Sequence, residues 1–359
     1  MARKLRIAVI GVGAIALSAH LPAYTGFNQI AEVCAVVSRT KESAKHAADV
    51  FGIRSWFTNV RQMLESIQPD VVSICTPNAS HAELVQLCLE YGAHVLCEKP
   101  LTLSGKKAEE LYALAQKEKR ILMTAQTVRF TPFVQRAKLL LDQGLLGPLY
   151  LLEIDRIRNR GVPAWGAFQR KESNLGGAMC DIGVHQLDAV LWLAGNPRPV
   201  SAHSFLASPL SLSGQPVCTD MAKNGAFYGT KPASPDMDVE EFAAGSLLLE
   251  GGKMLLFKTA WAAHLPDRTC LTLLGSNGGL ELPSLALHGV QADIPEWEDE
   301  FASHPFSGHW HIIRNLLFAA TGRAEPVITP EQTICVSRAL ELIYHPQEFG
   351  SEGTSASKS

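Results

Sequence analysis

Short apolar and β-branched runs alternate with amphipathic helical segments over residues 1–125, and this alternation constrains the fold more than any other feature. The runs recur at intervals of about 25 residues, at 5–11, 32–38, 70–76, 94–100 and 121–127. Strands that alternate with helices build a parallel sheet with helices on both faces, because each helix carries the chain back to begin the next strand in the same direction. The sequence therefore predicts a doubly wound α/β domain at 1–125.

The turn after the first run reads Gly11-Val12-Gly13-Ala14-Ile15-Ala16, a GxGxxA pattern between a predicted strand and a predicted helix. Missing side chains at the two glycines let backbone N–H groups approach a pyrophosphate at the helix N-terminus. The pattern alone also occurs in ordinary tight turns, and its position here favours a nucleotide site. We expect dinucleotide binding at Gly11, Gly13, Ala14 and Ile15.

The second run ends in Ser38-Arg39-Thr40, where an NAD-binding fold usually carries an acid for the ribose 2′-hydroxyl. A hydroxyl and a guanidinium would instead hold a 2′-phosphate by charge-assisted hydrogen bonds. The alternative is a solvated Arg39 beside a helix cap at Thr40. Ser38 and Arg39 therefore favour NADP over NAD as cofactor.

Polar residues follow three later runs at the edge of the predicted sheet where ligands of doubly wound folds bind. They are Thr76, Pro77 and Asn78 with His81 beyond them, then Glu98 and Lys99, and finally Gln126. Lys99 is thereby expected to point into the cofactor crevice; a surface ion pair with Glu98 is the alternative. We predict that all seven residues line the cofactor site.

The chain after residue 125 changes to longer strands joined by irregular loops, which predicts an α+β domain at 126–349 built on a large open, mainly antiparallel sheet. A helix is expected to end near Gly144, and Gly251-Gly252 predict a two-residue hairpin turn. Residues 208–238 are rich in Ser, Pro and Gly and predict an excursion over a cleft or an interface. The tail at 350–359 is expected to be disordered.

A helix is predicted from about 178 to 194, apolar nearly all round except at Asp181, His185 and Asp188. Their spacing of i, i+4 and i+7 places the three on one face. Ionisable groups on a buried helix are costly unless they are paired or used, so the stripe is either a reactive site or a satisfied core network. A metal site is not expected, since no second cluster of His or Cys completes a ligand set.

Composition excludes several classes of function. A formal charge of -3 and a pI near 6.5 offer no basic surface for nucleic acid. The basic and apolar start could pass for a secretory signal, but the glycines of its apolar run have their own structural explanation, and no segment is apolar enough to span a membrane. The eight cysteines form no CxxC pair and are expected to be core residues in a reducing cytoplasm.

Three motifs together resemble the glucose-fructose oxidoreductase, inositol dehydrogenase and rhizopine catabolism family, abbreviated Gfo/Idh/MocA. These are GxGxxA with His20 downstream, EKP at 98–100, and GGxxxDxGxHxxD at 176–188. The resemblance covers nearly the whole chain. It implies a Rossmann domain, a second domain with an open sheet, NAD(P)-dependent oxidation or reduction of a sugar or cyclitol, and homodimers or homotetramers that associate through that sheet.

The resemblance also implies roles for single residues. The family's catalytic lysine falls on Lys99, its helix aspartate on Asp181 and its acid/base histidine on His185. The loop motif TPNxxH, beside the cofactor, is matched by Thr76, Pro77, Asn78 and His81, and the cofactor-side glutamate by Glu98. The loop at 158–168 and the insert at 208–238 match no substrate motif of the family.

Three functions remain open on the sequence. In a dehydrogenase or reductase, His185 would handle the hydroxyl proton, Lys99 would stabilise the alkoxide and Asp181 would hold the imidazole tautomer. A glycosidase would use a tightly held NAD transiently, by oxidation at a sugar C3 and elimination. A non-catalytic nicotinamide sensor would need no ionisable pair in the crevice. The alternate arginines Arg156, Arg158 and Arg160 would line a subunit interface or reach an anionic substrate.

Overall fold

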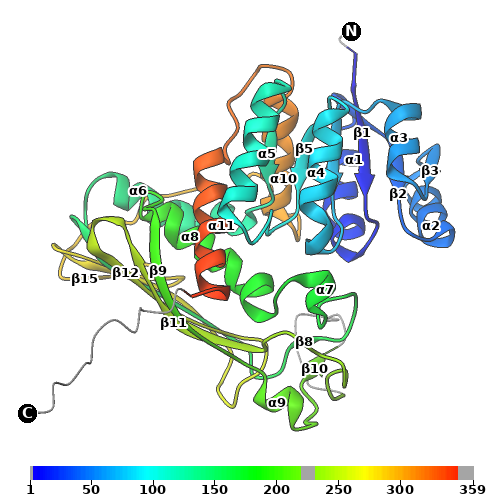
Figure 1. Cartoon of the computed structure of the whole chain (residues 1–359). Helices are drawn as coiled ribbons and strands as arrows, with labels where there is room; N and C mark the ends of the chain where they lie inside the picture. The colour runs from blue at the N-terminus through cyan, green and yellow to red at the C-terminus, as the bar shows by residue number, and fades with distance from the viewer. Residues whose placement is uncertain (1–2, 220–230, 347–359) are drawn as a thin grey trace, which may run out of the picture.

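Two β-sheets, one in each half of the chain, organise the fold (Figure 1). The computed structural model describes residues 3–219 and 231–346, so the predicted tail at 350–359 lies outside the described residues. The first sheet has six strands in the order β3-β2-β1-β4-β5-β6, and all of its pairings are parallel. Its strands are β1 (Leu5–Ile10), β2 (Ala31–Val37), β3 (Ser55–Phe57), β4 (Val71–Ile74), β5 (His94–Cys97) and β6 (Leu122–Thr124). The predicted doubly wound sheet is confirmed, with β3 as an added edge strand.

Helices cover both faces of this sheet, and side-chain caps begin several of them. They are α1 (Leu21–Gly26), α2 (Lys41–Phe51), α3 (Val60–Ile67), α4 (His81–Glu90) and α5 (Gly105–Lys117). The N-cap side chains of Thr40 and Ser104 accept backbone N–H groups at 3.3 Å, which satisfies donors that the first helical turn cannot. A π-helical turn, η1 (Ala16–His20), precedes α1 and places His20 against the sheet. His20 of η1 thereby lies against Ser73 of β4 and against Glu98, which follows the carboxyl end of β5.

Helix α10 (Ser307–Ala319) returns from the second half of the chain to pack on the first sheet (Figure 1). Its apolar side chains share one core with strand β1 and helix α1. Those buried residues are Ile312, Ile313, Leu316 and Leu317 from α10 with Ile7, Val9 and Leu21 from the first half. The N-terminal turn of α10 thereby reaches the carboxyl edge of the first sheet.

The second sheet has seven strands in the order β15-β14-β13-β7-β12-β11-β9. They are β7 (Leu149–Ile157), β9 (Pro199–Ala207), β11 (Phe242–Leu249), β12 (Lys253–Ala260), β13 (Arg268–Gly275), β14 (Gly279–Leu282) and β15 (Ala286–His288). Only β7 and β12 pair in parallel among these neighbours, so the predicted, mainly antiparallel sheet is confirmed. The hairpin turn is longer than predicted, because Leu249 faces Lys253 and leaves three residues, 250–252, in the turn.

One face of the second sheet is covered by α6 (Pro132–Asp142), α8 (Val184–Leu193) and α11 (Pro330–Tyr344) (Figure 1). Alternate strand residues such as Leu152, Ile154 and Leu255 are buried against these helices. Side chains on the opposite face stay accessible: Phe205 is 63% exposed and Leu256 is 38% exposed. Large apolar groups therefore stand on a sheet face that no helix of the described residues covers.

Short elements connect the longer helices and strands. They are η2 (Asn78–Ser80), η3 (Thr127–Phe130), β8 (Val162–Pro163), α7 (Lys171–Asn174), η4 (Met179–Gly183), α9 (Pro209–Leu212), β10 (Cys218–Thr219) and η5 (Glu250–Gly252). Strands β8 and β10 pair in parallel, so the described part of the 208–238 segment adds a small two-stranded sheet. Residues 220–230 of that segment lie outside the described residues. None of the helices described combines the length and apolar character that crossing a bilayer requires.

Candidate active site

Lys99 lies just past the carboxyl end of β5 and points toward the second half of the chain. Its Nζ donates to the backbone oxygen of Asp181 at 2.6 Å and lies 3.3 Å from the carboxylate oxygen Oδ1 of the same residue. Both side chains are about 15% exposed, so the pair is shielded but reachable. The structure thus joins two predicted residues that lie 82 positions apart.

Asp181 is held in place by a second donor, the indole of Trp261. The Trp261 Nε1–H donates to Oδ2 at 2.9 Å, and the indole is fully buried. Burial alone would raise the pKa of Asp181, but Lys99, Arg158 and the indole hydrogen bond together lower it below its usual value. The carboxylate therefore stays ionised and anchors the ammonium group.

His185 lies close to this pair without bonding to Asp181. Burial, with the Lys99 charge adding to it, lowers the pKa of His185 to about 3, so the imidazole is neutral near pH 7. Its Nδ1 is buried and has no hydrogen-bond partner among residues 3–219 and 231–346. The two carboxylate oxygens of Asp181 contact Lys99 and Trp261 instead. The expected Asp181 contact to the imidazole is therefore not found.

The partners of Asp181 explain this difference. Residues Met179–Gly183 form a π-helical turn, η4, and the regular helix α8 begins only at Val184. Asp181 and His185 therefore lie on consecutive elements, but Lys99 and Trp261 contact both carboxylate oxygens of Asp181.

Asp188 belongs to a buried network with Arg129. Its carboxylate accepts two hydrogen bonds from the Arg129 guanidinium, at 2.5 and 2.6 Å, and Arg129 also donates to Gln332. Arg129 and Asp188 are 2% and 1% exposed. Asp188 is therefore part of a satisfied core network. Lys99, Asp181 and His185 remain the candidates for a reactive site.

The glycines of the first turn leave room for a ligand phosphate. Gly11 has a φ of +86°, and a side chain there would meet the Cys75 carbonyl oxygen at 2.6 Å. A Cβ added at Gly13 would meet no atom within 4 Å. Packing within the chain thus requires the first glycine but not the second, whose open space fits the approach of a pyrophosphate to the exposed Ala14 at the start of the helix.

Most of the other predicted cofactor residues border the same crevice. His81 is buried, with its ring nitrogens 2.9 Å from the Thr76 oxygen and 2.7 Å from the Pro100 oxygen, so it ties the loops after β4 and β5 together. The Asn78 amide nitrogen donates to the backbone oxygen and to the side-chain oxygen of Asn174. Pro77 precedes η2, and Ile15 lies half-buried behind the first turn. His81 and Asn78 therefore shape the crevice through contacts within the protein.

Two predicted residues have polar groups that the chain leaves available. The Gln126 side chain is 1% exposed, and its Oε1 has no hydrogen-bond partner among the described residues. Such a buried acceptor is costly unless a ligand N–H, such as that of a nicotinamide carboxamide, meets it. Arg39 is exposed after β2, beside the helix cap Thr40. These positions fit the two ends of a nicotinamide dinucleotide.

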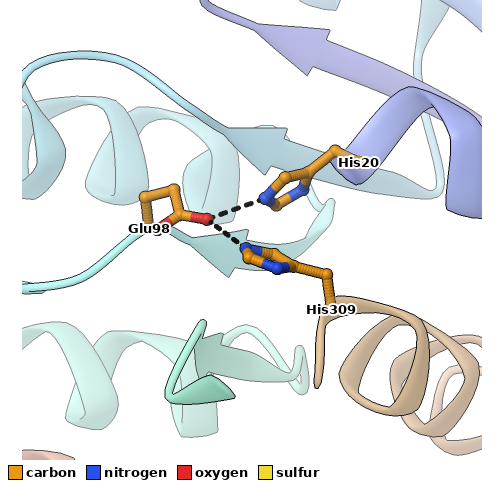
Figure 2. Close-up of side chains that lie close together, drawn as sticks. All are labelled: His20, Glu98 and His309. Atoms are coloured by element: carbon orange, nitrogen blue, oxygen red, sulfur yellow. Dashed lines mark hydrogen bonds and ion pairs between the residues drawn. The ribbon is translucent and has the colours of Figure 1, made fainter. Parts of the chain in front are cut away.

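Glu98 takes part in a buried cluster that the sequence did not indicate (Figure 2). Its Oε1 lies 2.9 Å from Nε2 of His20 and 2.9 Å from Nε2 of His309. Burial would raise the pKa of Glu98, but the two imidazole hydrogen bonds hold it well below its usual value. Zinc uses such donor groups, yet both contacts have ordinary hydrogen-bond lengths, which fits a proton-linked cluster.

Sequence reasoning missed Arg129, Trp261 and His309. The signal for His309 lay in GHWHIIRNLLFAATG, a strongly apolar helical run that carries two histidines near its start. Trp261 and Arg129 carried no comparable signal, because their partners lie 80 and 59 positions away. Each of the three was visible only once the fold had brought distant segments together.

Of the alternate arginines, Arg156 lies within β7, on the helix-covered side of the second sheet. Arg156 shares the strand side of the buried Leu152 and Ile154, and it donates to Thr269 Oγ1 at 2.7 Å. Burial lowers the pKa of Arg156 to about 10, with a further lowering from Arg158, while Asp267 and Asp181 oppose the shift. Arg156 therefore faces the site side of the sheet and not its bare face.

Comparison with known proteins agrees with this architecture. The family model described as an oxidoreductase family with an NAD-binding Rossmann fold matches residues 5–126, and the Gfo/Idh/MocA C-terminal domain model matches residues 134–281. A crystal structure of GenD2 from gentamicin A biosynthesis in complex with NAD has a TM-score of 0.76 at 23% identity, and the match covers 96% of this chain and 94% of that chain. That structure supports the fold alone.

Two proteins are also similar to this chain in sequence. D-glucoside 3-dehydrogenase of Escherichia coli (strain K12) is 32% identical over 271 residues, which cover 75% of this chain and 74% of that protein. The scyllo-inositol 2-dehydrogenase (NADP(+)) IolU of Bacillus subtilis (strain 168) is 33% identical over 184 residues, which cover 49% of this chain and 55% of that protein. With both domain models matched in order along the chain, this protein belongs to the Gfo/Idh/MocA family of oxidoreductases.

Proposed function

We propose that this protein is an NAD(P)-dependent oxidoreductase that transfers a hydride between nicotinamide and a hydroxyl-bearing carbon of a sugar, sugar derivative or cyclitol. The observation that carries the proposal is the meeting of the Lys99 ammonium and the neutral His185 imidazole around Asp181, at the carboxyl edge of the first sheet. The relatives act on this substrate class, as their names state. When bound, the nicotinamide supplies the hydride acceptor or donor.

The side chains have separate tasks in this reaction. His185, neutral and half-buried, accepts the hydroxyl proton on its imidazole as the carbon loses hydride. An ammonium group has three donors, and the two directed at Asp181 leave a third for the substrate oxygen. Lys99 thus stabilises the developing alkoxide, and Asp181 with Trp261 holds Lys99 in position.

A substrate panel tests the proposal. Sugars, glycosides, sugar phosphates and inositols are scanned with NAD and with NADP at the nicotinamide absorbance band. We expect stoichiometric reduction of cofactor with at least one neutral polyol substrate. Hydrolysis of a glycoside without net cofactor reduction would instead indicate the glycosidase, and binding of cofactor without turnover of any compound would leave only the sensor.

We also propose NADP as the preferred cofactor, on the support of the exposed Arg39 and the absence of an acid at 38–40. Replacement of Arg39 by Ala should weaken NADP binding about tenfold or more while NAD binding changes little, because only NADP carries the 2′-phosphate. Isothermal titration with both cofactors measures this. Equal losses for NAD and NADP would show that Arg39 does not read the phosphate, and Lys45→Ala on the exposed side of α2 is the matched control.

We propose that the protein forms a homodimer or homotetramer. The subunits would associate through the face of the second sheet that no described helix covers. The exposed Phe205 and Leu256 support it, because large apolar groups on one face need a cover. Light scattering at micromolar concentration should give a multiple of the 38.9 kDa chain mass, and Phe205→Glu with Leu256→Glu should give the monomer. Val50→Glu on α2, also at an exposed apolar position, is the control that should leave the assembly intact. A monomeric wild type would refute the assembly.

The cytoplasm is the compartment we propose. No disulfide is found among the eight cysteines, all of which lie in the described residues, and six of them are buried. Such usage supports a reducing environment.

A further inference from the structure

The Glu98 cluster of His20, Glu98 and His309 has no task in the mechanism above. All three side chains are buried, and they come from three separate elements: η1, the loop after β5, and α10 (Figure 2). A buried carboxylate costs free energy unless the protein compensates or uses it. Two imidazole groups compensate the Glu98 carboxylate by hydrogen bonds, and Glu98 immediately precedes Lys99 in the chain. We therefore expect its charge to act on a group in the adjacent site.

The ionised state of Glu98 sets the hydrogen-bond directions in the cluster. The two imidazole hydrogen bonds hold the pKa of Glu98 well below its usual value against the effect of burial, and an ionised carboxylate only accepts, so the Nε2 atoms of His20 and His309 both donate to Oε1. The Lys99 backbone N–H donates to the second oxygen, Oε2, at 3.3 Å. Three donors and no acceptor face Glu98, which favours the ionised carboxylate.

A relay behind His20 fixes the tautomer of that ring. The Tyr24 hydroxyl lies 2.8 Å from Ser73 Oγ, and Ser73 Oγ lies 3.2 Å from His20 Nδ1. With the His20 proton on Nε2, its Nδ1 accepts from Ser73 and Ser73 accepts from Tyr24, so every group in the row is satisfied. Burial lowers the pKa of His20, which keeps this ring neutral. The ring thus directs a donor at Glu98 without cancelling its charge.

The carboxylate lies within electrostatic reach of the place of hydride transfer. Glu98 acts on the pKa of His185 by its charge, and its chain neighbour Lys99 contacts Asp181 directly. A nicotinamide ring that presents its C4 to a substrate held by Lys99 and His185 stands in the same region. The ring is positively charged when oxidised and neutral when reduced, so a fixed anion interacts differently with the two forms.

We propose that Glu98 stabilises the oxidised, positively charged nicotinamide over the reduced form, and that His20 and His309 are positioning residues that hold the carboxylate for this purpose. The inference rests on the proposed function, since it requires nicotinamide in the crevice. It adds a property of the cofactor site: the protein sets the relative affinity for the two redox forms with a buried charge, and thereby lowers the reduction potential of the bound cofactor, which makes its reduced form the stronger hydride donor.

The test is a binding measurement without substrate. The full chain is titrated with NADP⁺ and with NADPH at pH 8, above the range in which histidine side chains usually titrate, and the ratio of the two dissociation constants is taken. Glu98→Gln keeps the side-chain shape and an oxygen acceptor but removes the charge. We expect it to weaken NADP⁺ relative to NADPH about tenfold, as for the loss of one interaction between partly screened unit charges.

The positioning residues should act in the same direction with smaller effect. His20→Asn and His309→Asn each remove one donor, so we expect a shift of about threefold in the same ratio. The exposed Glu83→Gln on α4 is the matched control and should leave the ratio unchanged. Thermal unfolding of each variant identifies any loss of fold. If a histidine variant does not fold, the ratio of dissociation constants measured for Glu98→Gln alone tests the inference.

The outcomes separate the inference from the function on which it rests. If wild type binds both forms and Glu98→Gln leaves the ratio at its wild-type value, or weakens both forms equally, Glu98 is structural and the inference fails while the oxidoreductase stands. If wild type binds neither NADP nor NAD in either redox form, the proposed function fails and takes the inference with it.

Discussion

Replacing His185 by Asn, or Lys99 by Met, lowers turnover by about 10² to 10⁴ on an identified substrate and leaves cofactor affinity close to that of wild type. The pyrophosphate site that we propose at Gly11 and Gly13 borders Cys75 and Thr76 and not Lys99 or His185, so cofactor affinity should change little when either side chain is replaced. Because the pKa of His185 is held to about 3, its imidazole is neutral throughout pH 6 to 9, and the loss of turnover extends over that range. Steady-state kinetics and cofactor titration measure the two quantities.

Two exposed residues of the same types provide matched controls. His46→Asn on α2 and Lys106→Met on α5 remove the same groups far from the crevice and should retain wild-type turnover. A His185→Asn protein with wild-type turnover between pH 6 and 9 would show that this imidazole, like Asp188, serves only the core. The hydride-transfer mechanism would then have lost its proton acceptor.

The second large effect is on stability. Arg129→Met should lower the free energy of unfolding by about 3 to 5 kcal/mol, because it leaves the Asp188 carboxylate buried without the two hydrogen bonds that compensate it. Urea denaturation followed by circular dichroism measures the change. Lys117→Met breaks the exposed Lys117–Glu118 pair and should cost less than about 1 kcal/mol.

The double variant Arg129→Met with Asp188→Leu sharpens this test. If the loss comes from an uncompensated charge, removal of that charge should recover part of the stability. A single Arg129→Met variant as stable as the Lys117→Met control would show that the buried pair contributes nothing to the fold. Recovery in the double variant cannot be explained by the loss of guanidinium packing alone.

The first sheet was predictable because its pattern is local. Each apolar run is bounded by turn residues, and the alternation with helices fixes both the direction and the layering of the strands. Strand β3 was not predicted because its three residues, Ser55–Phe57, lie at the sheet edge and are all only half-buried. A run of three residues is too short to show the alternation of buried and exposed positions that indicates a strand.

The candidate site was predictable from motifs, but its internal contacts were not. Lys99 and Asp181 were both named from the motifs, but their direct contact was not predicted. The expected contact of Asp181 with the imidazole was not found because Lys99 and Trp261 occupy its two carboxylate oxygens, and the spacing of residues within one helix cannot reveal partners from other segments. Asp188 found its partner Arg129 from another element, which periodicity within one helix cannot reveal.

The return of α10 to the first sheet limits how these halves can be recombined. An exchange of substrate domains between relatives, cut near residue 126, would carry Ser307–Ala319 away with the donor half and separate His309 from Glu98. It would also strip Ile312 and Leu316 from the core that they share with β1. A chimera that keeps its nucleotide half intact therefore has to retain two segments from one parent, 1–126 and 307–319, while α11, which packs on the second sheet, has to come with the grafted half.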